Sequence, residues 1–136
     1  MRLWRCVHRQ HMAAAWSGDG AKAWGGRWNR KGRAMVYASE HAALAVLEVL
    51  VRLDGPQSLE AWRLVSTDVE TRDAPLLEPG DDAQAVGNAF LESGALVARV
   101  DSQVVPGRNY LINPEAEAWD VNRRTEVHII DTRLAA

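Results

Sequence analysis

The chain has 136 residues, of which 47% are hydrophobic and 25% are charged, and its formal net charge is −2. This length suits one domain, residues 1–136, with a core of its own, and the composition argues against wholesale disorder. The near-neutral charge disfavours a domain built to coat nucleic acid, and no run of about 18 apolar residues is present to span a membrane.

Cysteine usage and the N-terminus both favour a reducing compartment. Cys6 is the single cysteine, so no internal disulfide can form, and no Cys/His spacing typical of a zinc site occurs. The first ten residues carry scattered charges and lack the apolar segment of a signal peptide. We therefore expect a cytoplasmic protein without a bound metal, in which Cys6 belongs to the core.

The N-terminal third predicts two strands separated by a long polar loop. Residues 2–7 alternate loosely, which favours a strand, and residues 35–38 form a short apolar run typical of another. Between them, residues 17–33 are rich in glycine and polar groups and predict a loop. Loops of this length in compact domains are often functional.

Residues 40–53 predict a helix, with Ser39 as its N-cap and Gly55-Pro56 as its stop. Between positions 42 and 51 every residue except Glu48 is Ala, Val or Leu. A helix that is apolar all round is expected to be buried.

The second half predicts one more helix and several strands. The expected elements are a strand over 61–69, a loop over 74–80, a helix over 82–93, strands over 95–100 and 103–105, a turn at Pro106-Gly107, and strands over 109–112 and 126–133. Because the strands cluster without regular helical crossovers, the sequence predicts an α+β fold with mainly antiparallel pairing.

Glu48 is the most informative single residue. By helical spacing it shares a face with Leu44, Leu47 and Val51, and an unpaired buried carboxylate is costly. It must therefore be paired, neutral or facing a cavity. A structural salt bridge and a functional site are both open interpretations.

The segment Trp24-Gly25-Gly26-Arg27-Trp28-Asn29 suits a ligand that carries both phosphates and rings. The glycines allow close backbone approach, and Arg27 offers a planar fork beside the aromatic surface of Trp28. The alternative is a turn with packed tryptophans and a solvated arginine.

Four other polar residues are weaker candidates. Tyr37 could stack on a flat ligand group or be a core tyrosine, and Ser102 could be a site residue or a turn residue. Asn109 and Asn113 flank an apolar run and are equally compatible with structural hydrogen bonding.

Common nucleotide-binding and hydrolase motifs are missing. The sequence contains neither GxGxxG after a strand nor GxxxxGK[ST], so neither a Rossmann turn nor a P-loop is expected. No GxSxG nucleophile elbow occurs, and the four histidines show no metal spacing.

Several short motifs, in this order along the chain, resemble the RES-domain family. They are Gly-Gly-Arg-Trp-Asn (25–29), Lys-Gly (31–32), Val-Tyr-Ala-Ser (36–39), Leu-Glu-Val-Leu-Val (47–51), Ser102 before Pro106, and Asn-Tyr-Leu-Ile-Asn-Pro (109–114). The chain departs from the family pattern at Asp101, where proline is frequent, and lacks the usual histidine after Pro114.

The resemblance implies a fold like that of ADP-ribosyltransferases, NAD as the substrate and no cofactor. It places the family's catalytic groups on Arg27, Tyr37, Glu48 and Ser102. The residues it implies for NAD binding are Arg27, Trp28, Tyr37, Ser102 and Asn113.

The resemblance also implies a toxin of a bacterial toxin–antitoxin pair, with an Xre-type antitoxin as partner. Such a toxin cleaves the nicotinamide–ribose bond, as a glycohydrolase or phosphorylase, or as a mono-ADP-ribosyltransferase with a host protein as acceptor. An RNA-binding or RNA-cleaving toxin that uses Trp24, Trp28 and the basic loop remains a third interpretation. The net charge and Glu48 disfavour it, and we expect no direct contact with nucleic acid or membrane.

Overall fold

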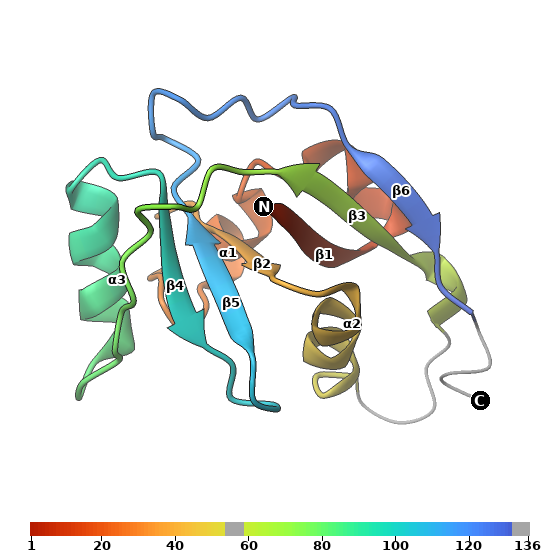
Figure 1. Ribbon diagram of the computed structural model, residues 1–136, viewed down its shortest axis with the longest axis horizontal. Coiled ribbons are helices and arrows are strands. Elements are labelled where there is room, and N and C mark those ends of the chain that lie inside the picture. The colour runs from red at the N-terminus through yellow and green to blue at the C-terminus, as the bar shows by residue number, and fades with distance from the viewer. Residues whose placement is uncertain (54–58, 132–136) are drawn as a thin grey trace.

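The computed structural model describes residues 1–53 and 59–131, and its centre is a six-stranded sheet (Figure 1). The strands lie in the order β4-β5-β2-β1-β3-β6, and each neighbouring pair is antiparallel. Their bounds are β1 (Arg2–His8), β2 (Val36–Ser39), β3 (Trp62–Asp68), β4 (Val97–Asp101), β5 (Arg108–Ile112) and β6 (Glu126–Ile129). The prediction of an α+β fold with antiparallel pairing is confirmed.

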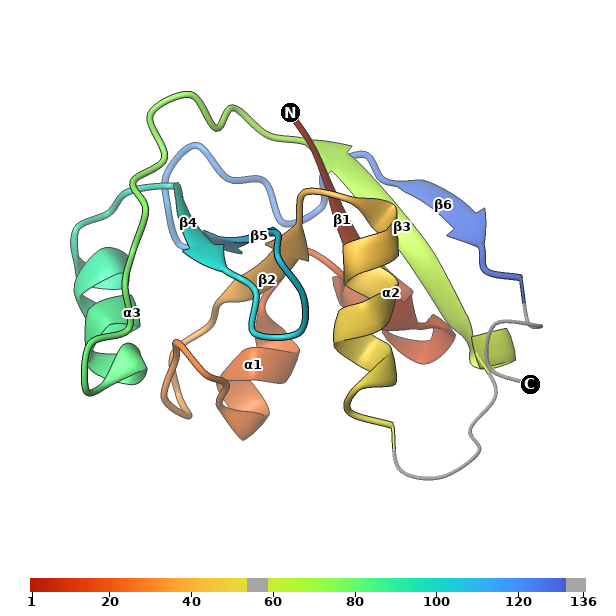
Figure 2. The ribbon, with the colours of Figure 1, turned by 60° about the horizontal axis from the view of Figure 1, so that its bottom comes forward.

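Two α-helices and two 3-10 helices lie between the strands of the N-terminal half, and one further α-helix precedes β4. The helical elements are η1 (Arg9–Ala14), α1 (Asp19–Trp24), α2 (Ala42–Leu50), η2 (Leu59–Ala61) and α3 (Ala83–Glu92). Figure 2 shows α3 beside β4 and α2 in front of β1 and β3. The predicted helices over 40–53 and 82–93 are therefore present, and both are shorter than expected.

Several sequence-based expectations differ from the structure in detail. The segment 17–33 is not all loop, because α1 forms between Gly18 and Gly25, whose φ angles are 76° and 75°. Ser39 does not cap α2: it is the last residue of β2, and His41 holds the N-cap position. Pairing of Ser39 with Trp4 and Asn109 outweighs its capping tendency.

The expected strand over 103–105 is also absent, because these residues belong to a tight connection between β4 and β5. The amide of Ser102 donates to the carbonyl of Gly107 at 2.9 Å, and the Ser102 side chain accepts from the amide of Val104 at 3.0 Å. β6 ends at Ile129, earlier than predicted. The predicted helix stop at Gly55-Pro56 lies outside the described residues.

The core lies on both faces of the sheet. On one face, Leu3, Val36, Val65 and Ile112 are buried together with Trp16. On the other, α3 packs on β4 and β5 and α2 packs on β1, β2 and β3. This arrangement leaves α2 and α3 as separate walls on one side of the sheet.

The centre of the sheet is loosely paired between β1 and β2. Their register contains one pair, Trp4 with Ser39, and the Arg5 side chain occupies the adjoining space. Its Nε donates to the Tyr37 carbonyl at 2.9 Å, and Nη1 donates to the Ala15 carbonyl. The Arg5 guanidinium group thus supplies hydrogen bonds to main-chain carbonyls at a place where the β1–β2 pairing is not continuous.

Candidate active site

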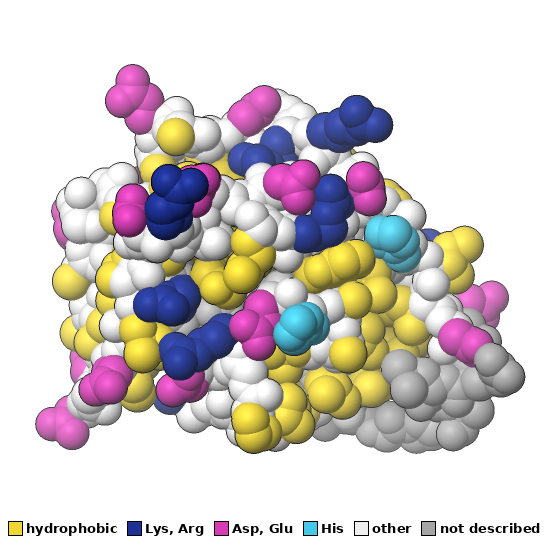
Figure 3. All heavy atoms as spheres, viewed as in Figure 1, with side chains coloured by type: hydrophobic (Ala, Val, Ile, Leu, Met, Phe, Trp, Pro, Cys, Tyr) yellow, Lys and Arg dark blue, Asp and Glu magenta, His cyan; other side chains and the backbone are white. Residues whose placement is uncertain are grey.

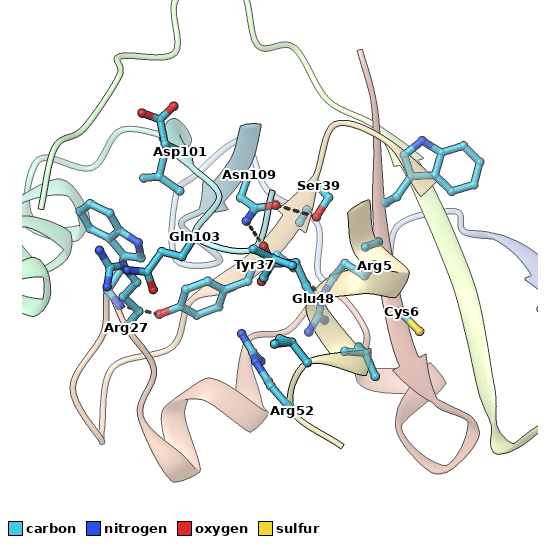
Figure 4. Close-up of a pocket in the computed structure, with 18 residues that line it drawn as sticks. Arg5, Cys6, Arg27, Tyr37, Ser39, Glu48, Arg52, Asp101, Gln103 and Asn109 are labelled. Atoms are coloured by element: carbon cyan, nitrogen blue, oxygen red, sulfur yellow. Dashed lines mark hydrogen bonds between the residues drawn. The ribbon is translucent and has the colours of Figure 1, made fainter. Parts of the chain in front are cut away.

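A pocket of about 470 Å³ lies on the side of the sheet that carries α2 (Figure 4). Its walls come from β1, β2, α2, the β4–β5 connection and the loop that follows α1. The size is within the range of roughly 300–1,000 Å³ typical of small-molecule sites. Polar side chains from all these elements converge here.

Glu48 projects from α2 into this pocket, and two neutral donors hold its carboxylate. Ser102 Oγ donates to Glu48 Oε1 at 2.7 Å, and Asn109 Nδ2 donates to the same oxygen at 2.8 Å. The ion pairs between described residues do not include Glu48. A structural salt bridge, one of the two interpretations of Glu48, therefore has no support in this part of the chain.

The environment of α2 differs from the sequence-based expectation of complete burial. Leu44, Ala45 and Val46 are buried, whereas Leu47 is 38% and Val51 64% exposed. The apolar helix therefore presents one side to the core, while Leu47 is exposed and Glu48 and Val51 line the pocket. The sequence pattern could not distinguish a core neighbour from a pocket.

Asn109 owes its position to the β2–β5 pairing. Ser39 and Asn109 lie directly opposite each other in that register, and Ser39 Oγ donates to Asn109 Oδ1 at 2.7 Å. The amide group of Asn109 then faces Glu48, as Figure 4 shows. Sequence reasoning named Asn109 without a role and treated Ser39 as a cap.

Asn113, the predicted ligand-binding asparagine, is not in the pocket. It is buried, its Nδ2 donates to the Leu91 carbonyl at 3.3 Å, and its Oδ1 accepts from the Glu115 amide at 3.0 Å. These bonds fix the chain beyond β5. The structure therefore does not bring Asn113 together with Arg27, Tyr37 and Glu48, and Asn109 is the asparagine that lines the pocket.

The Gly-Gly-Arg-Trp-Asn segment is a rigid turn that directs Arg27 outward. Gly25 has a φ of 75°, which favours glycine, and a Cβ at Gly26 would lie 2.6 Å from Tyr37 Oη. Trp28 and Asn29 are buried, whereas Arg27 is exposed, lines the pocket and lies 5.8 Å from the centre of the Trp28 ring. The buried side chains of Trp28 and Asn29 therefore hold the segment in place, while the Arg27 guanidinium group is accessible at the pocket.

Asn29 ties this turn to its surroundings. Its Nδ2 donates to the carbonyls of Ala21 and Arg33 at 2.8 and 2.9 Å. Its Oδ1 accepts from Tyr37 Oη at 2.6 Å, and the same hydroxyl accepts from the Trp28 amide at 3.0 Å. These bonds connect the turn to β2.

Tyr37 lines the pocket with a hydroxyl that stays protonated. Burial raises the pKa of Tyr37 to about 12, against the smaller opposing effects of its hydrogen bonds and of Arg52. The phenol is therefore neutral at physiological pH and not available as a base. Its ring is the part that can contact a ligand.

α3 packs against the Gly-Gly-Arg-Trp-Asn turn and holds it in place. Gln84 Nε2 donates to the carbonyls of Gly26 and Asn29 at 2.9 and 3.1 Å. Gly87 packs so closely that a Cβ there would overlap the carbonyl oxygen of Trp28. The position of Arg27 therefore depends on a helix that contributes no side chain to the pocket.

The pocket carries an excess of positive side chains. Arg5, Arg27 and Arg52 line it, whereas its carboxylates are Glu48 and Asp101, and Asp101 pairs with Arg108 at 3.2 Å. Burial, followed by repulsion from Arg52, lowers the pKa of Arg5 to about 10, so that Arg5 remains charged at neutral pH. This charge distribution suits an anionic ligand.

Sequence reasoning missed Arg5 and Arg52. Arg52 follows Glu48 by one helical turn, so the helical spacing contained a signal for it. Arg5 reaches the pocket because of the loose pairing between β1 and β2, which the sequence does not specify. Burial raises the pKa of Cys6 to about 11, which agrees with the expected core thiol and disfavours a thiolate nucleophile.

The described parts of the chain contain neither a candidate metal site nor a candidate membrane-spanning helix. Among residues 1–53 and 59–131, no group of three or more His, Cys, Asp or Glu side chains is placed to hold a metal ion. Within the same ranges no helix has the length and apolarity needed to cross a membrane. On the face in Figure 3, acidic and basic side chains are interspersed, as the small net charge leads one to expect.

Comparison with known proteins identifies the class. The model of the RES domain matches residues 2–132. The chain is 35% identical to Toxin Res of Yersinia enterocolitica over 133 residues, covering 88% of both chains. It is also 35% identical to the Prs ADP-ribosylating toxin of Sphingobium sp. over 131 residues, covering 82% of this chain and 81% of the relative.

A solved structure supports the fold. The chain superposes on a chain of the M. tuberculosis MbcT-MbcA toxin-antitoxin complex with a TM-score of 0.64 and 19% identity, covering 94% of this chain and 84% of the other. The match is consistent with the ADP-ribosyltransferase-like architecture that the resemblance implied. The family model over residues 2–132 and the relatives at 35% identity show that this protein belongs to the RES-domain family.

Proposed function

We propose that this chain is the toxin of a bacterial toxin–antitoxin pair and that it consumes NAD by cleaving the nicotinamide–ribose bond. The observation that carries the proposal is the Glu48 carboxylate, fixed by two donors in a pocket that three arginines line. Family membership supports it, because relatives of this chain are named as toxins and one of them as an ADP-ribosylating toxin.

The proposed chemistry follows from the charge that develops on the sugar. Cleavage of the N-glycosidic bond gives the ribose oxocarbenium character, and nicotinamide leaves as a neutral molecule. Both hydrogen bonds that described residues donate to Glu48 go to Oε1, so Oε2 is the oxygen that faces that charge in this proposal. A fixed carboxylate stabilises the transition state more than the ground state, and no strong general acid is required.

The other site residues take binding roles in this proposal. Arg27 holds the NAD diphosphate through its planar fork, beside the indole of Trp28. The Tyr37 ring packs against nicotinamide, with its hydroxyl occupied by Asn29. Ser102 acts through Glu48, since its hydroxyl is bonded there.

Arg27→Lys should weaken NAD binding on the order of tenfold, because lysine keeps the charge and loses the two-pronged contact. Stability should stay the same, since Arg27 is exposed and forms no ion pair with a described residue. Isothermal titration of NAD measures the effect. Arg30→Lys is the matched control, because Arg30 lies in the same loop but pairs with Asp82 outside the pocket. Equal affinity in wild type and Arg27→Lys would exclude Arg27 as the phosphate clamp.

The acceptor of ADP-ribose separates two forms of the activity. Water or phosphate as acceptor defines a glycohydrolase or a phosphorylase, and a host protein defines a mono-ADP-ribosyltransferase. The name of the Sphingobium relative favours the transferase as second candidate. Incubation with labelled NAD, with and without cell extract, distinguishes free ADP-ribose, ADP-ribose phosphate and labelled protein.

A free toxin of this kind would harm its own host, so the proposal includes an Xre-type antitoxin that covers the pocket. Expression of this chain alone in bacteria should arrest growth and lower cellular NAD, and Glu48→Gln should relieve both. Co-expression of the antitoxin should restore growth. Growth arrest with normal NAD would contradict NAD depletion, and label from NAD on one host protein would then select the transferase.

A further inference from the structure

We infer that Ser39 and Asn109 form a positioning relay that sets which group of Asn109 faces Glu48. The inference rests on the proposed function, because it concerns the orientation of the carboxylate to which that function assigns the charge stabilisation. Ser39 has no role in the chemistry above, and Asn109 enters it only as one of the two donors to Glu48. Their contacts with each other and with Glu48 carry the argument.

The first step is the geometry of the relay. Ser39 Oγ donates to Asn109 Oδ1 at 2.7 Å, and Asn109 Nδ2 donates to Glu48 Oε1 at 2.8 Å. The three side chains come from β2, β5 and α2, so the relay crosses from the middle of the sheet to the helix. Figure 4 shows the chain of bonds from Ser39 through Asn109 to Glu48.

The second step is the polarity of an amide. An asparagine side chain has an acceptor-only oxygen and a donor-only nitrogen, and rotation by 180° exchanges them. The reversed orientation would bring Asn109 Oδ1 against Glu48 Oε1, so that two acceptors would face each other. A hydroxyl that donates to Oδ1 stabilises the orientation in which the nitrogen faces the carboxylate.

The third step is the placement of Ser39. It is buried, and it lies opposite Asn109 in the β2–β5 register and opposite Trp4 in the β1–β2 register. Its position is therefore fixed by strands on both sides at the point where β1 and β2 meet. A polar side chain buried in a sheet needs a partner, and Asn109 supplies it.

Asn109 and Ser102 both donate to Oε1 of Glu48. These two bonds fix the orientation of the carboxylate and with it the position of Oε2. Without the Ser39 hydroxyl, the Asn109 amide gains rotational freedom and Glu48 loses part of its preorganisation. Preorganisation acts on the transition state, so we expect the loss in kcat and little change in KM.

The experiment uses the full chain and compares Ser39→Ala, Ser39→Thr and Asn109→Asp with wild type in steady-state NAD consumption. Ser39→Ala should lower kcat about five- to tenfold, the effect of one hydrogen bond, with KM within about twofold. Ser39→Thr restores the hydroxyl and should recover activity. Asn109→Asp replaces the donor with a second carboxylate beside Glu48 and should lower kcat about 10²-fold.

Two matched controls address structural effects. Ser66→Ala removes a buried hydroxyl from β3, which β1 separates from β2, and Asn113→Asp makes the same change as Asn109→Asp outside the pocket. Both should keep kcat at the wild-type level as long as thermal unfolding shows a folded protein. A loss of kcat in these controls equal to that in the relay variants would overturn the positioning role.

An NMR measurement tests the relay without reference to NAD. In wild type, the two side-chain amide protons of Asn109 should be unusually far apart in chemical shift and protected from exchange, because one of them is bonded to the carboxylate. Ser39→Ala should bring the signals together and speed their exchange with water. Unchanged signals and unchanged kcat in Ser39→Ala would overturn the inference, while absence of NAD consumption by wild type would overturn the proposed function instead.

Discussion

Glu48→Gln is expected to lower the rate of NAD cleavage by about 10²–10³ while the protein stays folded. Glutamine has the same shape and can still accept the hydrogen bonds of Ser102 and Asn109 through its oxygen. What it loses is the negative charge that would stabilise the developing oxocarbenium ion. Steady-state kinetics with NAD, together with a thermal unfolding curve for each protein, measures the two effects separately.

Asp101→Asn is the matched control for this substitution. Asp101 also lines the pocket, but its carboxylate is largely exposed and pairs with Arg108. The same change from carboxylate to amide should leave the rate close to wild type. Full activity in Glu48→Gln would reduce Glu48 to a structural residue and contradict the proposed mechanism.

Gly87→Ala should destabilise the protein and weaken NAD binding, although position 87 lies in α3, away from the pocket. In a free helix alanine would be the better residue by about 1 kcal/mol. Here the added Cβ would overlap the Trp28 carbonyl, so the helix and the Arg27 turn must separate. Overpacking of this kind typically costs about 1–3 kcal/mol of the free energy of unfolding.

Chemical denaturation and NAD titration of the variant check both parts of this prediction. Gly20→Ala is the matched control, because Gly20 also lies in a helix, α1, and a Cβ there meets open space. It should be neutral or slightly stabilising. If Gly87→Ala behaved like Gly20→Ala, then α3 would not support the turn that carries Arg27.

The parts of the fold that follow local patterns could be predicted from sequence. The alternation of β1 and β3 and the apolar spacing of α2 and α3 give these elements within a few residues. The order of the strands in the sheet depends on contacts between segments that are distant in sequence, and local sequence patterns do not predict it. Ser39 illustrates the limit, because pairing with Asn109 decides its role.

The candidate site was predictable to a similar extent. Glu48 stood out because a carboxylate interrupts an apolar helix, and Arg27 because glycines precede it. Asn109 and Asn113 could not be separated by sequence, since both flank the same apolar run. In the structure the Asn109 side chain bonds to Glu48, whereas the Asn113 side chain bonds to the Leu91 carbonyl of α3. Arg5 required knowledge of the β1–β2 pairing.

Release of nicotinamide from NAD by the purified protein tests the central claim most directly. The reaction is followed by chromatography with and without cell extract, so that a protein acceptor is available if one is needed. We predict that wild type releases one nicotinamide for each NAD consumed, over many turnovers, and that Glu48→Gln does not. Intact NAD in both conditions, with wild type shown to be folded, would contradict the claim that this pocket cleaves NAD.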